Sequence, residues 1–303
     1  MTSTPRIFDR DLLDRRRTRA AHGAARHDFL LERAADDILW RLEVIERRFE
    51  VAAIVGAHHG ILASKLAGHR RIGTLIALER NAALLGQVGP DVLKVQADEE
   101  ALPFADGSLD LVVSALALQH VNDLPGVLIQ ARRALKPDGL LLASLLGGST
   151  LTELRGALIA AEEEEQGGAS PRVAPFADVR DLGGLLQRAG FALPVADADI
   201  VRVTYADALA LMRDIRAMGA SNILHDRSRA PMPRAMLAKA VEIYASRHGL
   251  PDGRVPATFE LLTMTAWVPH ESQQKPLAPG QARMRLADAL GTDERPAGEK
   301  ADR

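Results

Sequence analysis

Short apolar runs alternate with helical patterns along the first half of the chain, and this alternation constrains the fold more than any other feature. The runs typical of buried strands lie at five places, residues 51–55, 74–78, 92–96, 109–114 and 140–145. Helical patterns follow Gly56 through Leu66 and occupy residues 81–88 and 124–135. Strands that alternate with helices predict βαβ units with right-handed crossovers. We therefore expect an α/β fold with a doubly wound, mostly parallel sheet.

The segments on either side of this core predict additions to it. Residues 26–49 carry apolar side chains at helical spacing, which indicates an amphipathic helix before the first strand. Beyond Gly148 we expect helices at residues 150–164, 177–189, 205–218 and 233–248, and strands at 191–203 and 259–268. Four parts follow from these patterns: an N-terminal arm and helix (1–50), a ligand-binding core (51–148), a helical cap with the final strands (149–269) and a disordered polar tail (270–303).

Composition excludes several classes of function. The chain has no cysteine, which rules out disulfides, thiolate metal sites and a thiol nucleophile. Its formal net charge of -2 offers no general attraction to nucleic acid, so we expect no nucleic-acid partner. No apolar stretch is long enough for a membrane span or a secretory signal peptide. These features favour a cytoplasmic protein of bacterial type.

The N-terminal segment is rich in arginine, with a basic run that holds Arg15, Arg16, Arg17 and Arg19. Asp9, Asp11 and Asp14 argue against an organellar transit peptide, because such peptides are poor in acidic residues. The run could contact a partner, but an exposed helical arm is the default interpretation.

Candidate ligand-binding residues follow the ends of successive strands. Gly56 to Gly60 come after the first strand, where a glycine-bearing turn lets backbone approach a ligand at a helix N-terminus; an ordinary turn explains the loop equally well. Glu79 ends the second strand and could accept hydrogen bonds from ribose hydroxyls, although a surface glutamate is the alternative. Asp98 follows the third strand, where it could accept a hydrogen bond from the amino group of an adenine.

These residues belong to blocks that resemble a known family. Residues 98–104, 108–114 and 135–139 resemble class I S-adenosylmethionine-dependent methyltransferases of the methyltransferase-11 type. A closer likeness, to the mitochondrial complex I assembly factor 5 family and its bacterial relatives, lies in residues 8–10, 121–125, 147–151, 153–155, 167–168, 170–171, 175–176, 181–183, 188–191, 218–222 and 255–258.

The resemblance implies a Rossmann-like class I methyltransferase fold, S-adenosyl-L-methionine as cofactor and a subunit of respiratory complex I as substrate or client. It implies arginine hydroxylation or methylation, with possible contact to a membrane complex. A non-catalytic assembly chaperone and a small-molecule or carrier-protein O-methyltransferase are the alternatives. The expected cofactor-binding residues are Gly56, Ala57, His58, Gly60, Glu79, Arg80, Ala97, Asp98, Glu99, Ala115 and His120.

The chain departs from the family pattern in the first loop. Ile54 replaces an acidic residue, and His58 replaces the middle glycine, so a side chain would crowd the backbone approach. Gln119-His120 takes the place of a common His-Trp pair. A His at that place is frequent in the wider superfamily, whereas Ile54 and His58 favour the chaperone alternative.

Other residues raise weaker hypotheses. His58, His59 and His120 with Asp98 could hold a non-haem iron, but loop histidines without metal are the simpler interpretation, so we expect no metal. The acidic run of residues 162–165 is typical of a solvated helix face. Arg155, Asn222 and Thr258 lie in family-like segments outside the core and are candidates for the acceptor side. No catalytic residue can be assigned.

Overall fold

The structure, a computed structural model, describes residues 6–273, 285, 287–288 and 291–293. The residues up to Pro269 form one compact unit, and those from His270 onward form a second. The strands of the first unit are β1 (Phe49–Val55), β2 (Ile72–Glu79), β3 (Leu93–Gln96), β4 (Leu109–Ala115), β5 (Leu135–Leu146), β6 (Ala192–Tyr205) and β7 (Val255–Trp267). Most of the tail predicted to be disordered lies outside the described residues.

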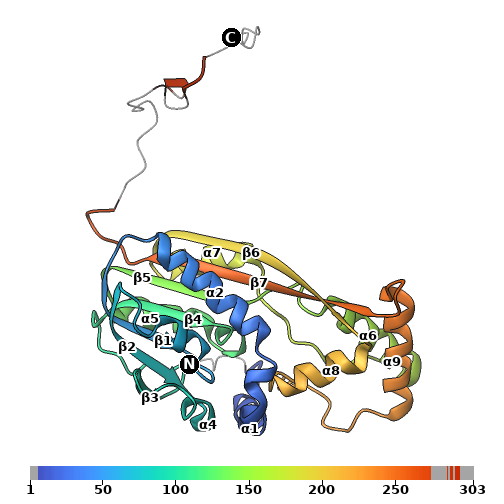
Figure 1. Cartoon of the computed structure of the whole chain (residues 1–303). Coiled ribbons are helices and arrows are strands. Elements are labelled where there is room, and N and C mark those ends of the chain that lie inside the picture. The colour runs from blue at the N-terminus through green and yellow to red at the C-terminus, as the bar shows by residue number, and fades with distance from the viewer. Residues whose placement is uncertain (1–5, 274–284, 286, 289–290, 294–303) are drawn as a thin grey trace. The chain divides into compact units, whose positions relative to one another are not determined.

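The helices surround this sheet (Figure 1). The α-helices of the unit are α1 (Arg10–Ala20), α2 (Phe29–Val44), α3 (Ile61–Leu66), α4 (Ala82–Leu85), α5 (Leu124–Ala134), α6 (Thr152–Gln166), α7 (Val179–Arg188), α8 (Ala208–Ala217) and α9 (Arg234–His248). Two 3-10 helices, η1 (Ala21–Arg26) and η2 (Leu118–His120), join them. Several helices begin at aspartates whose side chains accept a hydrogen bond from the first turn, as Asp123 does for α5 and Asp207 for α8.

The seven strands form one sheet in the order β3-β2-β1-β4-β5-β7-β6. The first five are parallel, β7 pairs antiparallel with β5, and β6 pairs antiparallel with β7. The order reverses beside β1, which places the β1 and β4 carboxyl ends next to each other. In doubly wound sheets a ligand binds at such a switch point. The prediction of a doubly wound, mostly parallel sheet is confirmed.

Alternate residues of each central strand enter different apolar cores. Ala52 and Ile54 of β1 pack in one cluster with α2, α3, α6 and α9. Ala53 and Val55 pack in another cluster with α5 and α7. The two-residue period of a strand thus sends its side chains to both faces, and helices bury both.

Three helices and strands begin or end at other residues than the sequence predicted. The helix expected at 26–49 ends at Val44, and the last of those residues already belongs to β1. Helix α4 is a single turn, closed at Gly86. Strand β5 includes the expected turn at 136–139, because Leu135 pairs with Leu109 before the register shifts.

The N-terminal arm is not the exposed helix that the sequence suggested. Arg17 of α1 is 9% exposed, and the side chain of Arg10 is equally buried. Phe8 is buried too, and forms an isolated antiparallel bridge with Leu224 of the cap. The arm therefore packs on the molecule.

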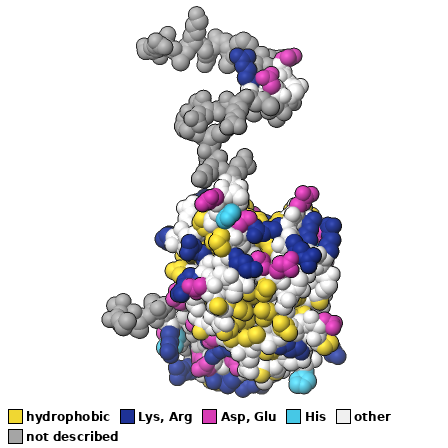
Figure 2. All heavy atoms as spheres, turned by 90° about the vertical axis from the view of Figure 1, so that its left-hand side faces the viewer, with side chains coloured by type: hydrophobic (Ala, Val, Ile, Leu, Met, Phe, Trp, Pro, Cys, Tyr) yellow, Lys and Arg dark blue, Asp and Glu magenta, His cyan; other side chains and the backbone are white. Residues whose placement is uncertain are grey.

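The surface of the described part carries scattered large apolar side chains, among them Trp40 and Val44 on α2 and Leu93 on β3. Figure 2 shows one face on which hydrophobic side chains gather in a patch bordered by charged ones. Among the described residues no helix combines the length and apolar character needed to cross a bilayer.

Candidate functional site

The loop after β1 is tightly held at the switch point. Gly56 has a positive φ of 75° and Gly60 one of 96°, a conformation that glycine adopts at little cost. A Cβ on Gly56 would lie 2.1 Å from the Ala117 Cβ, so no side chain fits there. Ala57 is buried between them.

His58 fills the centre of this loop. Its φ of 50° is unusual for a residue with a side chain. Its Nε2 lies 3.0 Å from the Ala115 carbonyl oxygen and 3.2 Å from that of Leu116, at the end of β4. Burial, together with the charge of Arg17, lowers the pKa of His58 to about 3. The imidazole is therefore neutral and donates its proton to these carbonyls.

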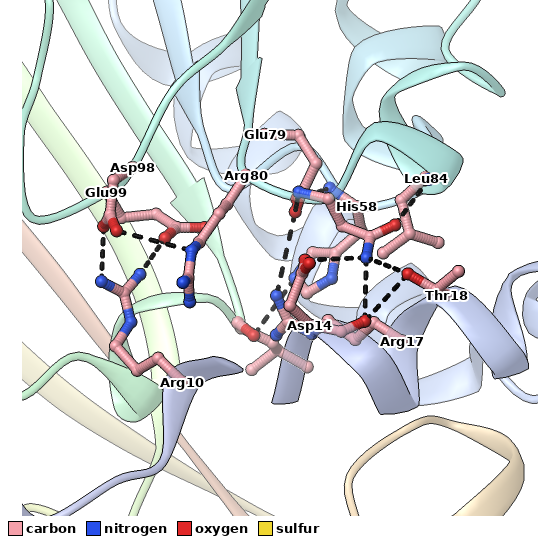
Figure 3. A network of polar contacts seen from close by, with 12 residues as sticks. Arg10, Asp14, Arg17, Thr18, His58, Glu79, Arg80, Leu84, Asp98 and Glu99 are labelled. Carbon is pink, nitrogen blue, oxygen red and sulfur yellow. Dashed lines mark hydrogen bonds and ion pairs between the residues drawn. The ribbon is translucent and has the colours of Figure 1, made fainter. Parts of the chain in front are cut away.

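Glu79 is fully buried at the end of β2. One carboxylate oxygen accepts the His58 N–H at 2.8 Å, and the other accepts the Asn81 N–H at 2.9 Å. Arg17 of α1 lies 4.0 Å from the carboxylate (Figure 3). Because a carboxylate can accept about four hydrogen bonds, Glu79 retains capacity for a ligand's hydroxyl groups.

Asp98 and Glu99 follow β3, and Arg10 of α1 binds both (Figure 3). Glu100 also lies 3.1 Å from Arg10. Burial raises the pKa of Asp98, but the Glu100 N–H and Arg10 outweigh it, so the net shift is downward. Burial and the nearby Glu79 raise the pKa of Glu99. One buried guanidinium thus offsets a cluster of carboxylates at the strand ends.

The remaining predicted residues surround these carboxylates. Arg80 donates to Asp11 of α1 at 2.6 Å and lies 3.5 Å from Asp98. Ala97 packs partly buried beside β3. The structure therefore brings the predicted residues of the three strand ends together, and it adds α1, whose arginines face the carboxylates.

A cavity of about 110 Å³ lies beside this cluster, between α1, η1, the loop after β1 and η2. Gln119 and His120 of η2 line it, as do His58, His59 and Asp28. The His59 Nε2 lies 3.2 Å from an Asp28 carboxylate oxygen. Burial and the charge of Arg17 hold the pKa of His120 well below its ordinary value, so this imidazole is neutral.

Two side-chain atoms of the cavity wall have no hydrogen-bond partner. These are Gln119 Oε1 and His120 Nδ1, both buried. The Gln119 amide is oriented by its nitrogen, which donates to the Leu116 carbonyl at 2.8 Å. Buried polar atoms are almost always paired with protein or ordered water, so these two atoms are exceptions within the described residues.

The structure gives no support to a metal centre. Within the described residues no three His, Asp or Glu side chains are grouped so that they could hold a metal ion. His58 is occupied by backbone carbonyls and His59 by Asp28.

The acidic run at 162–165 is not uniformly solvated. Glu162 is 3% exposed, and its carboxylate binds Arg172 and Ser170. The prediction was wrong for this residue, because the loop after α6 folds back over it.

The three acceptor-side candidates do not line the cavity. Arg155 donates to the backbone carbonyls of Gly148 and Thr150, at 3.4 Å and 3.3 Å. Asn222 donates to the Pro171 carbonyl, and Thr258 binds Glu153. All three hold loops and strands of the cap.

Sequence reasoning missed Arg10, Arg17, Asp28 and the side chain of Gln119. The family-like Phe8-Asp9-Arg10 block could have indicated Arg10. No local pattern places Asp28 beside His59, since they are brought together by packing.

The residues at the strand ends fit the adenosine part of S-adenosyl-L-methionine. Glu79 and Asp98 are acceptors at neighbouring strand ends, as a ribose and an adenine amino group require. Arg10 contacts Asp98 and Arg17 lies 4.0 Å from Glu79, so a ligand placed against both carboxylates would require α1 to shift. At the loop, the His58 imidazole holds the two carbonyls that a ligand's amino group could otherwise use.

The fold and these strand-end carboxylates define a class I methyltransferase-fold protein. Residues 54–143 match the family described as "Methyltransferase domain". The YcgJ protein from Bacillus subtilis has a similar fold, with a TM-score of 0.54 at 13% identity over 78% of this chain and 99% of that one.

Relatives that match nearly the whole chain identify a narrower family within this class. The chain is 38% identical to the mitochondrial arginine-hydroxylase NDUFAF5 of Danio rerio over 286 residues, 93% of this chain and 89% of the relative. It is 35% identical to a malonyl-[acyl-carrier protein] O-methyltransferase of Halorhodospira halophila, over 91% of this chain and 95% of the relative. The chain belongs to the NDUFAF5 arginine-hydroxylase family.

Proposed function

We propose that this chain binds S-adenosyl-L-methionine and modifies an arginine side chain of a respiratory complex I subunit during assembly of that complex. The observation that carries the proposal is the 38% identity to an arginine-hydroxylase, which extends through core and cap alike. The complex I partner rests on the family-like blocks of the sequence. We place the protein in the bacterial cytoplasm, where such a subunit is reached before the complex is complete.

The chain's own residues supply binding and orientation. Glu79 would accept hydrogen bonds from ribose hydroxyls and Asp98 from the adenine amino group, while the loop from Gly56 to Gly60 would lie against the methionine part. When bound, the cofactor supplies an electrophilic methyl group. The cap and α1 would exclude water and hold the acceptor side chain in line, which is the main contribution a protein makes to such a transfer.

Titration calorimetry with S-adenosylmethionine and S-adenosylhomocysteine tests the cofactor site. We expect binding by the wild type and a loss of about tenfold in affinity in Asp98→Ala, because a hydrogen bond to a charged group is removed. Asp106→Ala is the matched control, since Asp106 is exposed and, within the described residues, its ion-pair partner is Arg133. Equal affinity in both variants would contradict the assignment of Asp98.

A non-catalytic assembly chaperone is the second candidate, favoured by His58 in the loop and by the arginines on the carboxylates. Under this alternative the wild type shows no heat of cofactor binding, and an Asp98→Ala strain still assembles complex I. Under our proposal the same strain accumulates incomplete complex I on native gels.

A carrier-protein O-methyltransferase is the third candidate, favoured by the relative from Halorhodospira halophila. Incubation of the protein with labelled S-adenosylmethionine and malonyl-carrier protein separates this candidate from the first. Transfer of label to the carrier protein would contradict our proposal and identify the chain as a carrier-protein O-methyltransferase.

A further inference from the structure

Two hollows lined by arginines adjoin on the surface that α1 shares with the cap. One has a volume of about 660 Å³ and lies between α1, η1 and α8 (Figure 1). The other, of about 570 Å³, lies between α1 and the segment that joins α8 to α9. Arg16 lines both hollows, so they form one arginine basin. Among the described residues, no carboxylate forms an ion pair with the lining arginines Arg15, Arg16, Arg19, Arg213, Arg216 and Arg229.

The basic run of α1 is divided between two surfaces of the helix. Arg17 points inward and lies 4.0 Å from Glu79. Arg15, Arg16 and Arg19 line the basin instead. Residues three and four positions apart share one side of a helix, which groups these three side chains. The outward part of the run is therefore free to meet a ligand.

The carboxylates nearest the basin are committed to other groups. Asp9 pairs with Arg227 at 3.1 Å. Asp214 of α8 accepts a hydrogen bond from the Tyr205 hydroxyl at 2.7 Å and contacts the His27 ring. These carboxylates offset part of the positive charge, but they do not reach the arginines at the wall of the basin.

The arginines of the basin act on one another. Burial and the charges of Arg227, Arg19 and Arg216 lower the pKa of Arg16, and Asp9 opposes this shift only in part. Like charges held close together cost free energy, and an anionic ligand removes that cost. Because the whole chain has a formal net charge of only -2, this concentration of positive charge is a local feature.

The basin adjoins the cavity beside the strand ends. Ala20 and His27 line both of them. A ligand bound in the basin can therefore continue toward the predicted cofactor site, provided that it is a chain long enough to span both. This position favours a polymeric anion over a small one.

The lining favours a polypeptide among polymeric anions. It contains no Phe, Tyr or Trp among the described residues, on which nucleic-acid bases would stack. None of the large apolar side chains that are exposed elsewhere lines it, although a lipid surface would need such groups for insertion. The hydroxyl groups of Ser221 and Ser228 can accept hydrogen bonds from the N–H groups of a peptide backbone.

We infer that the arginine basin docks an acidic segment of the acceptor protein, whose aspartate and glutamate side chains pair with Arg16, Arg213 and Arg216. The inference rests on the proposed function, from which it takes a protein as the acceptor, and it adds the surface that recognises this protein. Arginine suits the role because its planar guanidinium can donate two parallel hydrogen bonds to one carboxylate. The docked segment holds the neighbouring part of the acceptor chain near the cavity.

Fluorescence anisotropy with the full chain tests the inference. The probe is a labelled decapeptide of alternating glutamate and serine, and the comparator carries glutamine in place of each glutamate. We expect the glutamate peptide to bind at least about tenfold more tightly. Its affinity should fall steeply between about 50 and 200 mM NaCl, because salt screens exposed charges. Equal affinity for the two peptides would overturn the inference.

Paired arginine variants locate the binding. Arg213→Gln with Arg216→Gln removes two charges from the basin and should lower the affinity for the glutamate peptide about tenfold. Arg180→Gln with Arg188→Gln is the matched control, because it removes the same charge from exposed positions of α7, outside the basin. All four side chains are exposed, so both variants should keep the wild-type melting temperature. An equal loss of affinity in the two variants would show that net charge alone governs binding, and the basin would not be a docking surface.

Two further probes separate an acidic protein segment from other anions. They are vesicles of phosphatidylglycerol and phosphatidylcholine, and a thymidine oligonucleotide with the same charge as the peptide. We expect both to bind more weakly than the glutamate peptide at the same salt concentration. Tighter binding of either probe, lost in the α8 variant, would make the basin a lipid or nucleic-acid surface and contradict the inference.

The cofactor titration is independent of these results. A protein that binds S-adenosylhomocysteine but does not prefer the glutamate peptide retains the cofactor part of the proposed function and loses only this docking surface. A protein that binds the glutamate peptide but gives no heat with the cofactor keeps the docking surface and loses the cofactor part.

Discussion

Single residues in the loop after β1 determine which backbone groups face the predicted cofactor site. His58 occupies a left-handed backbone position that glycine adopts freely, and its side chain lies against the end of β4. The sequence correctly indicated that this residue is unusual. Only the structure shows that the imidazole is neutral, buried and bonded to two carbonyl groups.

His58→Gly is expected to raise the affinity for S-adenosylhomocysteine about tenfold, a gain of about 1.4 kcal/mol. The substitution opens the carbonyls at the end of β4 and removes the cost of a positive φ in a residue with a side chain. Titration calorimetry measures the change. Leu193→Gly is the control, since Leu193 has the same φ of 50° but lies on β6, outside the site. A weaker affinity would show that His58 is part of the binding surface, and an unchanged affinity would show that its imidazole does not obstruct the ligand.

A buried ion pair stabilises the end of helix α6 in the cap. Glu162 near the end of α6 binds Arg172 and Ser170, which closes the following loop on the helix. The hydrogen bond from Arg172, together with the Ser170 N–H, lowers the pKa of Glu162 to about 2 despite burial. A lowered folded-state pKa stabilises the fold above the unfolded value of 4.5, and this contribution is lost as the pH falls from there toward about 2.

Glu162→Gln is therefore expected to lower the free energy of unfolding at pH 7 by about 2 kcal/mol. The difference from the wild type should shrink as the pH falls from 4.5 toward 2, because the wild-type carboxylate becomes protonated there. Urea unfolding at a series of pH values measures it. The exposed neighbour Glu163, changed to Gln, is the control and should alter stability by less than about 0.5 kcal/mol. A pH-independent difference would exclude the ionised pair as the cause.

At the scale of the whole molecule, the N-terminal arm connects the two halves of the chain. Arg10 binds carboxylates of the core, and Asp9 receives a hydrogen bond from Arg227 of the cap. Phe8 accepts from the Asn122 side chain and bridges to Leu224. A ligand that bound Glu79 and Asp98 would have to displace the arginines of α1, so we expect binding and arm movement to be coupled.

Hydrogen exchange should reveal this coupling. We expect amides of α1, residues 10–20, to exchange faster when S-adenosylhomocysteine saturates the protein, because Arg10 and Arg17 lose their carboxylate partners. Mass spectrometry of peptides from α1 measures the rate, and α7, which packs in a different apolar cluster, is the internal control. Slower exchange in α1 would mean that the ligand binds beneath an arm that stays closed.

The order of strands and helices could be predicted from the amino-acid sequence alone, as could the positions of Glu79 and Asp98 at strand ends. Such features follow from local side-chain periods, and the ends of parallel strands necessarily share one edge. The family also followed from the sequence, because family-like blocks are spread through core and cap. The roles of these residues in cofactor binding stay predictions.

The contacts between side chains that are distant in the sequence could not be predicted and became known from the fold. Arg10 binds carboxylates almost ninety residues away in the sequence. Asp28 contacts His59. Glu162 is buried by the loop after α6, which the pattern of that helix does not predict. The unpartnered atoms of Gln119 and His120 are likewise a property of packing. These contacts depend on how helices close over the sheet, and the burial that drives this closure depends on area rather than on the position of a residue in the sequence.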